Sequence, residues 1–418
     1  MDLYLSAGNI EITPAYPVAL AGFAERHGAY SKIHDTLEIN LAVLKQGDKY
    51  VLLYSIDTLF APEEFVKIVL ETFGSEYGLQ EKDIWMAASH THFAPALDKE
   101  KPDLGKTNDT YYREVQGKLI LLTRQVLTGN YKKVSVSYGT TKSALNVNRR
   151  KKLLRPKGGL KLYWKTLMYP DYDGVKDDNI HLVTFKDEEG NTAMVLWNYA
   201  CHPVGFKHRS QVSAEFPGLI RSELRGYLGD TRLPVLFFLG FAGNLKPDVT
   251  PVTHTRTRDK FNYFFQFGPK YTRFPSTGQY LEWIGLLWKE VKIAYKASSP
   301  KETVTLATTQ YKLPLSEIIG DDEKHTVCFR KLLLADSVQF IGVSAEVLAE
   351  YKDIVAEALQ QNVSINVGCL TGTRIYLPAD KNVGEGGYEV HWFQHRFGIK
   401  GDFKDDLDNK IKEAISRL

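Results

Sequence analysis

Three histidines occupy positions where an imidazole could bind a metal ion or transfer a proton. An apolar run, residues 84–88, leads directly to His90 and His92, and this segment predicts a buried strand that ends in His-Thr-His. Side chains alternate along a strand with a period of two, so both imidazoles are expected on the same face. A second apolar run, residues 194–200, leads to His202. The sequence thus places three histidines at the ends of two predicted strands.

This arrangement suits a metal site, although it does not require one. Imidazole nitrogens bind Zn²⁺ and related divalent ions, and a catalytic zinc keeps one position for water beside about three protein ligands. A His-x-His pair is equally compatible with hydrogen-bonded core or turn histidines. The sequence contains no HExxH, CxxC, GxSxG or GxxxxGK[ST] motif, which argues against standard metalloproteases, zinc fingers, α/β-hydrolases and P-loop NTPases.

Two long segments, 146–178 and 249–277, are predicted to be irregular and are rich in basic and aromatic residues. They could be solvated loops, or they could form a groove for an anionic, ring-containing ligand. In the second interpretation Arg256 and Arg258 bind substrate. The net charge is only +3, from 53 basic and 50 acidic residues, so a preference for anions must come from such clustering. Recognised nucleic-acid-binding patterns are absent, so no nucleic-acid partner is expected.

The surrounding elements alternate irregularly between strand-like and helical patterns. Strands are predicted at 37–44, 50–56, 134–138, 181–186, 193–199 and 235–239, and helices around 65–73, 281–295 and 347–359. Because strands and helices do not alternate strictly, the pattern favours an α/β fold of mixed β-sheets flanked by helices over a doubly wound sheet or a TIM barrel. No linker-like or repetitive stretch divides the chain, so residues 1–418 are expected to form a single large domain.

The composition, 43% hydrophobic and 25% charged, is that of an ordinary globular protein. Three scattered cysteines favour a reducing compartment over a disulfide framework. The first residues lack the pattern of a secretion signal, and no apolar stretch reaches the length of a membrane span. We therefore expect a cytoplasmic protein without an integral membrane segment.

A series of short motifs extends over most of the chain. They are LAGFA at 20–24, ASHTHFAP at 88–95, NVNR at 146–149, WNYACHP at 197–203, SAEFPG at 213–218, FAGNLKPD at 241–248, GVSAE at 342–346, YLP at 376–378 and GYE at 387–389. In content and order this series resembles the catalytic domain of the neutral/alkaline ceramidases, a family of zinc-dependent amide hydrolases. The resemblance implies that fold and a zinc cofactor for this chain.

The resemblance also implies roles for individual residues. The zinc ligands would be His90, His202, Glu346 and Tyr376. The residues around the scissile carbonyl would be His92, Arg149 and Tyr388, with Gly22 and Asn244 lining the substrate pocket. Zinc would activate water and polarise the carbonyl, while cationic and hydrogen-bonding side chains would stabilise the oxyanion.

Other interpretations of these residues stay open. Glu346 could instead begin the helix predicted at 347–359, and the two tyrosines could simply be half-buried. Manganese, iron or nickel would also suit the site.

One position departs from the family pattern. The loop serine that the family carries in the segment 241–248 is here Lys246. A lysine cannot replace a hydroxyl, but it could bind an anion or act with a depressed pKa. We therefore expect direct attack by zinc-activated water, with His92 or Glu215 transferring the proton.

These observations predict a zinc-dependent hydrolase of N-acyl amides, in the first place an N-deacetylase of an acidic N-acetylated sugar or polysaccharide. One alternative is a ceramidase-like lipid amidase, which would need an exposed apolar patch or an amphipathic entry helix, and none stands out in the sequence. The other is an inactive glycan-binding module.

Overall fold

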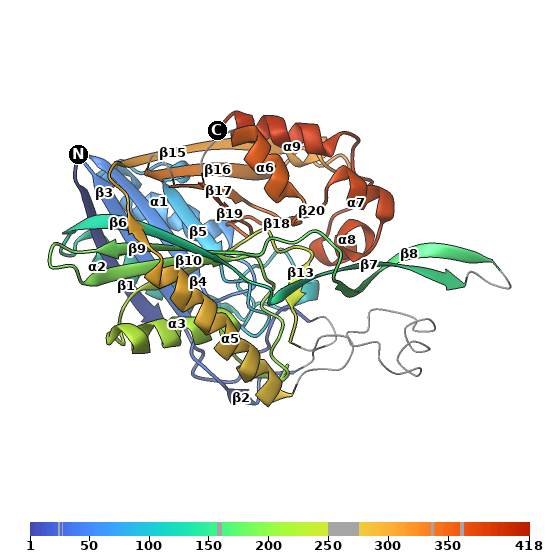
Figure 1. The fold of residues 1–418 in the computed structure, drawn as a ribbon, viewed down its shortest axis with the longest axis horizontal. Helices are drawn as coiled ribbons and strands as arrows, with labels where there is room; N and C mark the ends of the chain where they lie inside the picture. The colour runs from blue at the N-terminus through green and yellow to red at the C-terminus, as the bar shows by residue number, and fades with distance from the viewer. Residues whose placement is uncertain (24–25, 27, 157–160, 250–275, 336–337, 360–362) are drawn as a thin grey trace.

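The computed structural model describes residues 1–418 except 24–25, 27, 157–160, 250–275, 336–337 and 360–362 (Figure 1). Arg256 and Arg258 lie outside the described residues, as does most of the predicted segment 249–277. Within the described part of the chain, no helix has both the length and the apolar character needed to cross a membrane.

The larger sheet has nine strands and is mixed. Eight strands follow the order β12-β10-β9-β6-β1-β3-β4-β5, and β14 pairs with β6. The pairs β4–β5 and β10–β12 are parallel and the other neighbours are antiparallel. The strands are β1 (Leu3–Glu11), β3 (Glu38–Gln46), β4 (Lys49–Ile56), β5 (Ile84–Ala88), β6 (Lys132–Lys142), β9 (Asn179–Lys186), β10 (Thr192–Tyr199), β12 (Val235–Leu239) and β14 (Ser299–Pro300). Every strand predicted from the sequence is present in this sheet.

A four-stranded sheet, ordered β15-β16-β17-β19, packs face to face against the larger one. Its strands are β15 (Val304–Pro314), β16 (Thr326–Ala335), β17 (Val338–Val343) and β19 (Val363–Val367). The alternation of side chains along β4 shows how the layers form. Leu53 joins Leu332 and Phe340 in the core between the sheets, whereas its neighbour Leu52 points into a different core with the helices.

Helices cover both outer faces, so the molecule has four layers (Figure 1). The larger sheet is covered by α1 (Glu63–Tyr77), α2 (Asp109–Leu127), α3 (Glu215–Leu228) and α5 (Thr277–Lys296), and the smaller sheet by α6 (Tyr351–Leu359) and α9 (Leu407–Ser416). This arrangement confirms the predicted α/β class of mixed sheets flanked by helices.

Smaller elements complete the chain and surround the strand ends. The strands are β2 (Lys32–Ile33), β7 (Asn146–Pro156), β8 (Leu162–Asp171), β11 (Gln211–Val212), β13 (Leu245–Pro247), β18 (Glu346–Val347) and β20 (Tyr376–Leu377). The short helices and turns are η1 (Glu81–Asp83), η2 (Pro102–Leu104), η3 (Leu315–Glu317), α7 (Asp380–Glu385), η4 (Tyr388–Trp392) and α8 (Phe393–Phe397).

The prediction that residues 146–178 are irregular is wrong. Strands β7 and β8 pair as an antiparallel hairpin that projects from the body of the molecule, with β13 as a third strand at its base (Figure 1). Along β7 Lys152 is exposed while Leu153 and Arg155 are buried. The consecutive basic residues hid this period of two, because a long basic side chain can lie on either face of a ribbon.

The helix predicted at 347–359 is shorter than expected. The helix α6 begins only at Tyr351, and Glu346 and Val347 form β18, which pairs in parallel with β20. The alternative interpretation of Glu346 as the first residue of a helix is therefore wrong. Hydrophobic periodicity is recognised only over a longer stretch of sequence, so it cannot reveal a change from strand to helix within a few residues.

Candidate metal centre

His90, His92 and His202 come together beyond the ends of β5 and β10. Strand β5 ends at Ala88, and His90 has a left-handed backbone with φ of 63°, so the prediction that the His-Thr-His segment lies within a strand is wrong. The rings still meet. The centroid of the His90 ring lies 5.0 Å from that of His92 and 4.7 Å from that of His202.

The hydrogen bonds of His90 and His202 determine which ring nitrogen carries the proton. Nδ1 of His90 lies 2.8 Å from the carbonyl oxygen of Leu59, and Nδ1 of His202 lies 2.7 Å from that of Ala242. A carbonyl oxygen only accepts, so each Nδ1 donates and each neutral ring presents the lone pair of Nε2. The two Nε2 atoms face each other at 3.1 Å. Metal-binding histidines are typically held in this way by a backbone carbonyl.

Glu346 adds a third acceptor at the same point. Its Oε2 lies 3.3 Å from Nε2 of His90 and 3.3 Å from Nε2 of His202, and no hydrogen-bond donor reaches it among the described residues. The side chain is 3% exposed. Three lone pairs that converge in a buried position repel one another unless a cation lies between them. The residues therefore fit a divalent metal ion, and the nitrogen and carboxylate donors are those that zinc prefers.

The charges of the site favour one additional positive charge. Burial would lower the pKa of His90, but the neighbouring Cys369 and Glu346 raise it well above its ordinary value. Burial would raise the pKa of Glu346, but His90 and His202 hold it well below its usual range. Burial and the cation of Arg149 lower the pKa of His202 to about 4. A proton would supply the missing charge in the absence of a metal, and would compete with it at low pH.

Strand pairing holds Glu346 beside Tyr376. In the parallel pair β18–β20 these two residues are directly opposite each other. The hydroxyl of Tyr376 accepts a hydrogen bond of 3.3 Å from Nη2 of Arg149. Burial, and then the nearby carboxylate of Glu346, raise the pKa of Tyr376 well above its ordinary value. The four predicted ligands thus lie together, and their ligation of a metal stays a prediction.

Arg149 is held in place by a buried carboxylate that the sequence analysis did not identify. Its Nε donates to Oε1 of Glu389 at 2.9 Å, and its Nη2 donates to the carbonyl of Gly243 at 2.7 Å. Nη1 of Arg150 donates to Oε2 of the same Glu389 at 2.7 Å. Glu389 follows Tyr388 in the chain, and this position in a matched motif was the only available signal for it.

Tyr388 and His92 lie beside this group. The ring of Tyr388 packs edge-on against that of Tyr376, with centroids 5.7 Å apart. Nδ1 of His92 donates to the carbonyl of Gly22 at 2.9 Å, which leaves its buried Nε2 as an acceptor without a partner among the described residues. One ring nitrogen of each of His90, His92 and His202 could bind a metal, and these three nitrogens lie within 4.8 Å of one another.

The position of the His92 ring requires glycine at residue 22. Its φ of 101° is in the region that favours glycine, and a Cβ at this position would lie 2.5 Å from Nδ1 of His92. The backbone of Gly22 can approach the ring only because the residue has no side chain. This contact places Gly22 beside His92, and its role in lining a substrate pocket stays a prediction.

The side chains of Asn244 and Lys246 form hydrogen bonds within the protein. Asn244 donates from Nδ2 to Glu350 at 2.8 Å and accepts at Oδ1 from the amide of Ala349 at 2.9 Å, so its side chain joins two segments of the site. Lys246 is buried on β13 and donates from Nζ to the carbonyl of Pro247 at 3.1 Å. Burial lowers the pKa of its ammonium group.

Glu215 begins α3, and its carboxylate accepts three backbone hydrogen bonds, at 2.6 Å from Gly205, 2.9 Å from Phe206 and 2.6 Å from Phe216. These contacts occupy both oxygens. Burial raises the pKa of Glu215 from 4.5 to about 7, although the three amides oppose this change. The geometry therefore supports a structural role for Glu215 more directly than the expected proton transfer.

The raised pKa of Glu215 predicts a pH-dependent contribution to stability. The folded protein binds this proton more tightly than the unfolded chain, so the free energy of unfolding should fall as pH rises from 4.5 to about 7. In Glu215→Gln this component, up to about 3 kcal/mol, should be missing. Urea unfolding of both proteins at pH 5, 6, 7 and 8 measures it.

The control for this comparison is Glu223→Gln, which changes an exposed glutamate on the same helix. Its stability should follow that of the wild type at every pH. Parallel curves for the wild type and Glu215→Gln would contradict the prediction.

Comparison with known proteins supports the fold. No protein-family model and no curated protein sequence matches the chain. Among solved structures, the neutral ceramidase from Pseudomonas aeruginosa matches with a TM-score of 0.72 and 11% identity, over 100% of this chain and 74% of that chain. A structure described as a ceramidase complexed with C2 matches with a TM-score of 0.71 and 12% identity, over the same shares. The predicted resemblance to the fold of the neutral ceramidase catalytic domain is confirmed.

Proposed function

We propose that this chain is a metal-dependent hydrolase of N-acyl amides, of the ceramidase type, and that zinc is its metal. The observation that carries the proposal is the convergence of three buried acceptor atoms, from His90, His202 and Glu346, without a proton donor among the described residues. The likeness of fold to neutral ceramidase structures supports the same reaction class.

His90, His202 and Glu346 would hold the metal, with Tyr376 as the proposed fourth ligand. When bound, zinc supplies a water of lowered pKa and polarises a carbonyl oxygen. His92 is the proposed proton acceptor, because its Nδ1 donates to Gly22 and its Nε2 keeps a buried lone pair. Burial and the two neighbouring histidines lower the pKa of His92, so its ring is neutral and able to accept a proton.

The developing oxyanion would be stabilised by Arg149 and Tyr388. Hydrogen bonds to Glu389, Gly243 and Tyr376 fix the guanidinium of Arg149 next to Tyr376, so little reorganisation is needed during the reaction. The ring of Tyr388 lies 6.0 Å from the guanidinium carbon. Lys246 takes no covalent part in this proposal. Its buried charge would contribute to the positive potential near Arg149.

The test combines metal analysis with hydrolysis. Purified protein should contain about one zinc per chain, and removing it should abolish hydrolysis and lower the melting temperature. His90→Ala, which removes a proposed ligand, should behave like the metal-free protein. A protein that contains stoichiometric zinc but hydrolyses none of the N-acyl amides would refute the proposed hydrolase activity. Protein that neither contains nor responds to zinc would favour the inactive glycan-binding module.

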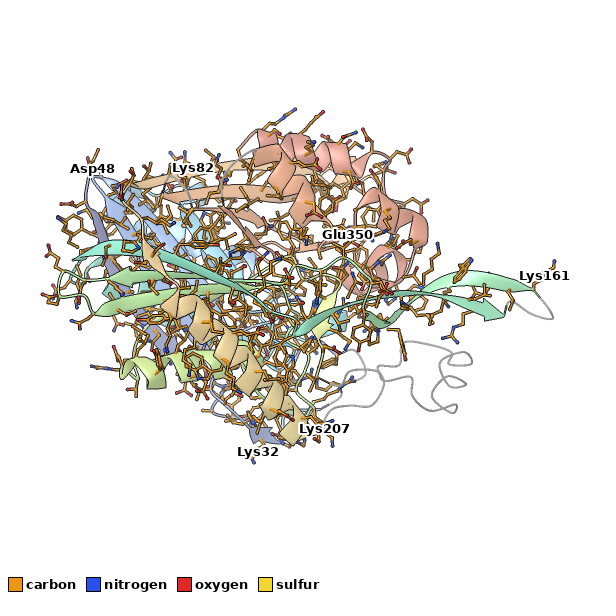
Figure 2. The ribbon with its side chains drawn as sticks, in the orientation of Figure 1. Lys32, Asp48, Lys82, Lys161, Lys207 and Glu350 are labelled. Carbon is orange, nitrogen blue, oxygen red and sulfur yellow. The ribbon has the colours of Figure 1, made fainter. Side chains whose placement is uncertain are left out.

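Two substrate classes remain within this proposal. The first is an acidic N-acetylated sugar or polysaccharide, with release of acetate as the measurement. The second is a lipid amide such as ceramide, and one observation favours it. Leu162 is 56% and Trp164 is 62% exposed on the projecting hairpin β7–β8, next to Lys161 (Figure 2). These two apolar side chains beside a basic residue suit contact with a lipid surface.

The hairpin predicts a difference between lipid-bound and soluble substrates. Replacing Leu162 and Trp164 together with serine should lower hydrolysis of a ceramide in anionic vesicles about tenfold, because two apolar side chains no longer leave water at the membrane. Hydrolysis of a short-chain soluble analogue should change less than twofold. Fluorescence assays on both substrates measure the two rates.

Leu121→Ser is the matched control, since it changes a leucine that is 49% exposed on α2. Equal losses on vesicle and soluble substrates in the hairpin variant would argue against a lipid contact there.

A further inference from the structure

Two arginines lie against the aromatic ring of Phe23, which packs against His92. The ring of Phe23 lies 5.1 Å from the ring of His92, measured between centroids. The guanidinium carbon of Arg26 lies 5.0 Å from the centroid of Phe23, and that of Arg209 lies 4.3 Å from the same centroid. Residues far apart in the sequence therefore place two positive charges one aromatic ring away from the proposed proton acceptor.

Arg26 is tied to the segment that carries His92. Its Nη2 donates to the carbonyl of His92 at 2.6 Å and to that of Ala21 at 2.8 Å. Its Nε and Nη1 are buried and have no hydrogen-bond partner among the described residues. Two donors of a cationic group thus remain without an acceptor at a buried position, which is unfavourable unless an anion completes the arrangement.

The charge balance around Arg26 points the same way. Burial, followed by the charge of Arg209, lowers the pKa of Arg26 to about 10, so the group is still a cation at neutral pH. No acidic residue in the described part of the chain contributes to this pKa or forms an ion pair with Arg26. The buried cation of Arg26, with Nε and Nη1 lacking an acceptor, therefore favours an anionic group of a ligand beside it.

We propose that Arg26 and Arg209, which both lie against the ring of Phe23, form a subsite for a carboxylate of the substrate. This inference rests on the proposed amide hydrolase and names its substrate class: N-acyl compounds with a carboxylate close to the amide, such as N-acylated amino acids. A planar carboxylate matches the fork of a guanidinium, and the half-buried Arg209 gives it access from solvent. The amide of such a substrate would then lie beside His92.

A pair of substrates that differ only in this charge tests the subsite. N-dodecanoylglycine has a carboxylate where N-dodecanoylethanolamine has an uncharged hydroxymethyl group, and the acyl chain and amide are the same. With zinc-loaded protein, kcat/KM should be at least about tenfold higher for the glycine compound, through a lower KM. Arg209→Gln should reduce this preference to less than threefold. Arg113→Gln, at an exposed site on α2, should keep it.

Calorimetric binding separates this inference from the proposed function. If the protein hydrolyses neither compound but binds the carboxylate at least threefold more tightly, and Arg209→Gln loses that difference, the subsite stands and the hydrolase fails. If the wild type shows less than a threefold preference in both assays, or if Arg209→Gln retains the full preference, the subsite is overturned. Sodium acetate should compete with the glycine compound, and full competition by acetate at low concentration would identify a site for free anions instead.

Discussion

Glu346→Gln is expected to lower zinc affinity by about 100-fold or more and to remove hydrolytic activity at ordinary zinc concentrations. Oε2 of Glu346 lies 3.3 Å from both facing histidine nitrogens, so it is the anionic member of the proposed ligand set. The glutamine side chain has nearly the same shape but no charge. Its amide group can also donate a hydrogen bond to one of the Nε2 atoms and so occupy the position of the metal.

This second property makes the experiment specific. Competition with a zinc chelator gives the affinity, and thermal unfolding with and without zinc gives the stabilisation by the metal. At a pH high enough to remove the proton from His90, the zinc-free variant should be at least as stable as the zinc-free wild type, because the glutamine amide supplies the donor that the deprotonated wild type lacks. Glu357→Gln, at an exposed position of α6, serves as the control. A stoichiometric, tightly bound zinc in Glu346→Gln would show that this carboxylate is not a ligand.

The second large effect is expected for Arg149→Lys, which should lower kcat by about 100-fold or more while the protein keeps its zinc. The guanidinium reaches Glu389, Gly243 and Tyr376 simultaneously through Nε and Nη2. A lysine ammonium is a point charge and cannot take these directions together. Steady-state kinetics and zinc content of the same preparation separate catalysis from metal binding.

Arg150→Lys provides a closely matched control. Arg150 donates to the same carboxylate of Glu389 and is also buried. Its other contacts are with the carbonyls of Asn382 and Gly386 and with the carboxylate of Glu385, away from Tyr376. Both variants should lose a similar amount of stability. A similar loss of kcat in both would show that Arg149 acts by supporting the fold, and the proposed role at the oxyanion would have to be abandoned.

Local patterns in the sequence predicted much of the scaffold. The predicted strands of the larger sheet contain apolar runs, so their positions follow from the sequence within a few residues, whereas the more polar β1 and the short β14 were not predicted. The two histidine segments follow such strands, which made His90 and His202 accessible to prediction. Even here the backbone differed from expectation, since His90 reaches the site through a left-handed turn and not through strand alternation.

Features that depend on distant pairing could not be predicted from local patterns. Glu346 lies opposite Tyr376 because two short strands pair, and neither strand has a pattern of its own. Glu389 is identified only by the two arginines of β7 that it bridges. The cluster of Arg26, Phe23 and Arg209 likewise arises from separate loops. For such groups the sequence shows which residue types are present, but it does not show which of them are in contact.

The distribution of the proposed ligands along the chain has a consequence for biosynthesis. His90 and His202 are separated by 112 positions, and Glu346 follows only in the last quarter of the 418 residues. A ribosome releases the chain from its N-terminus, so a nascent chain can fold much of the larger sheet while the carboxylate is still missing. Tight zinc binding should therefore begin only after Glu346 has emerged and β18 has docked. Zinc content would then distinguish finished molecules from truncated ones.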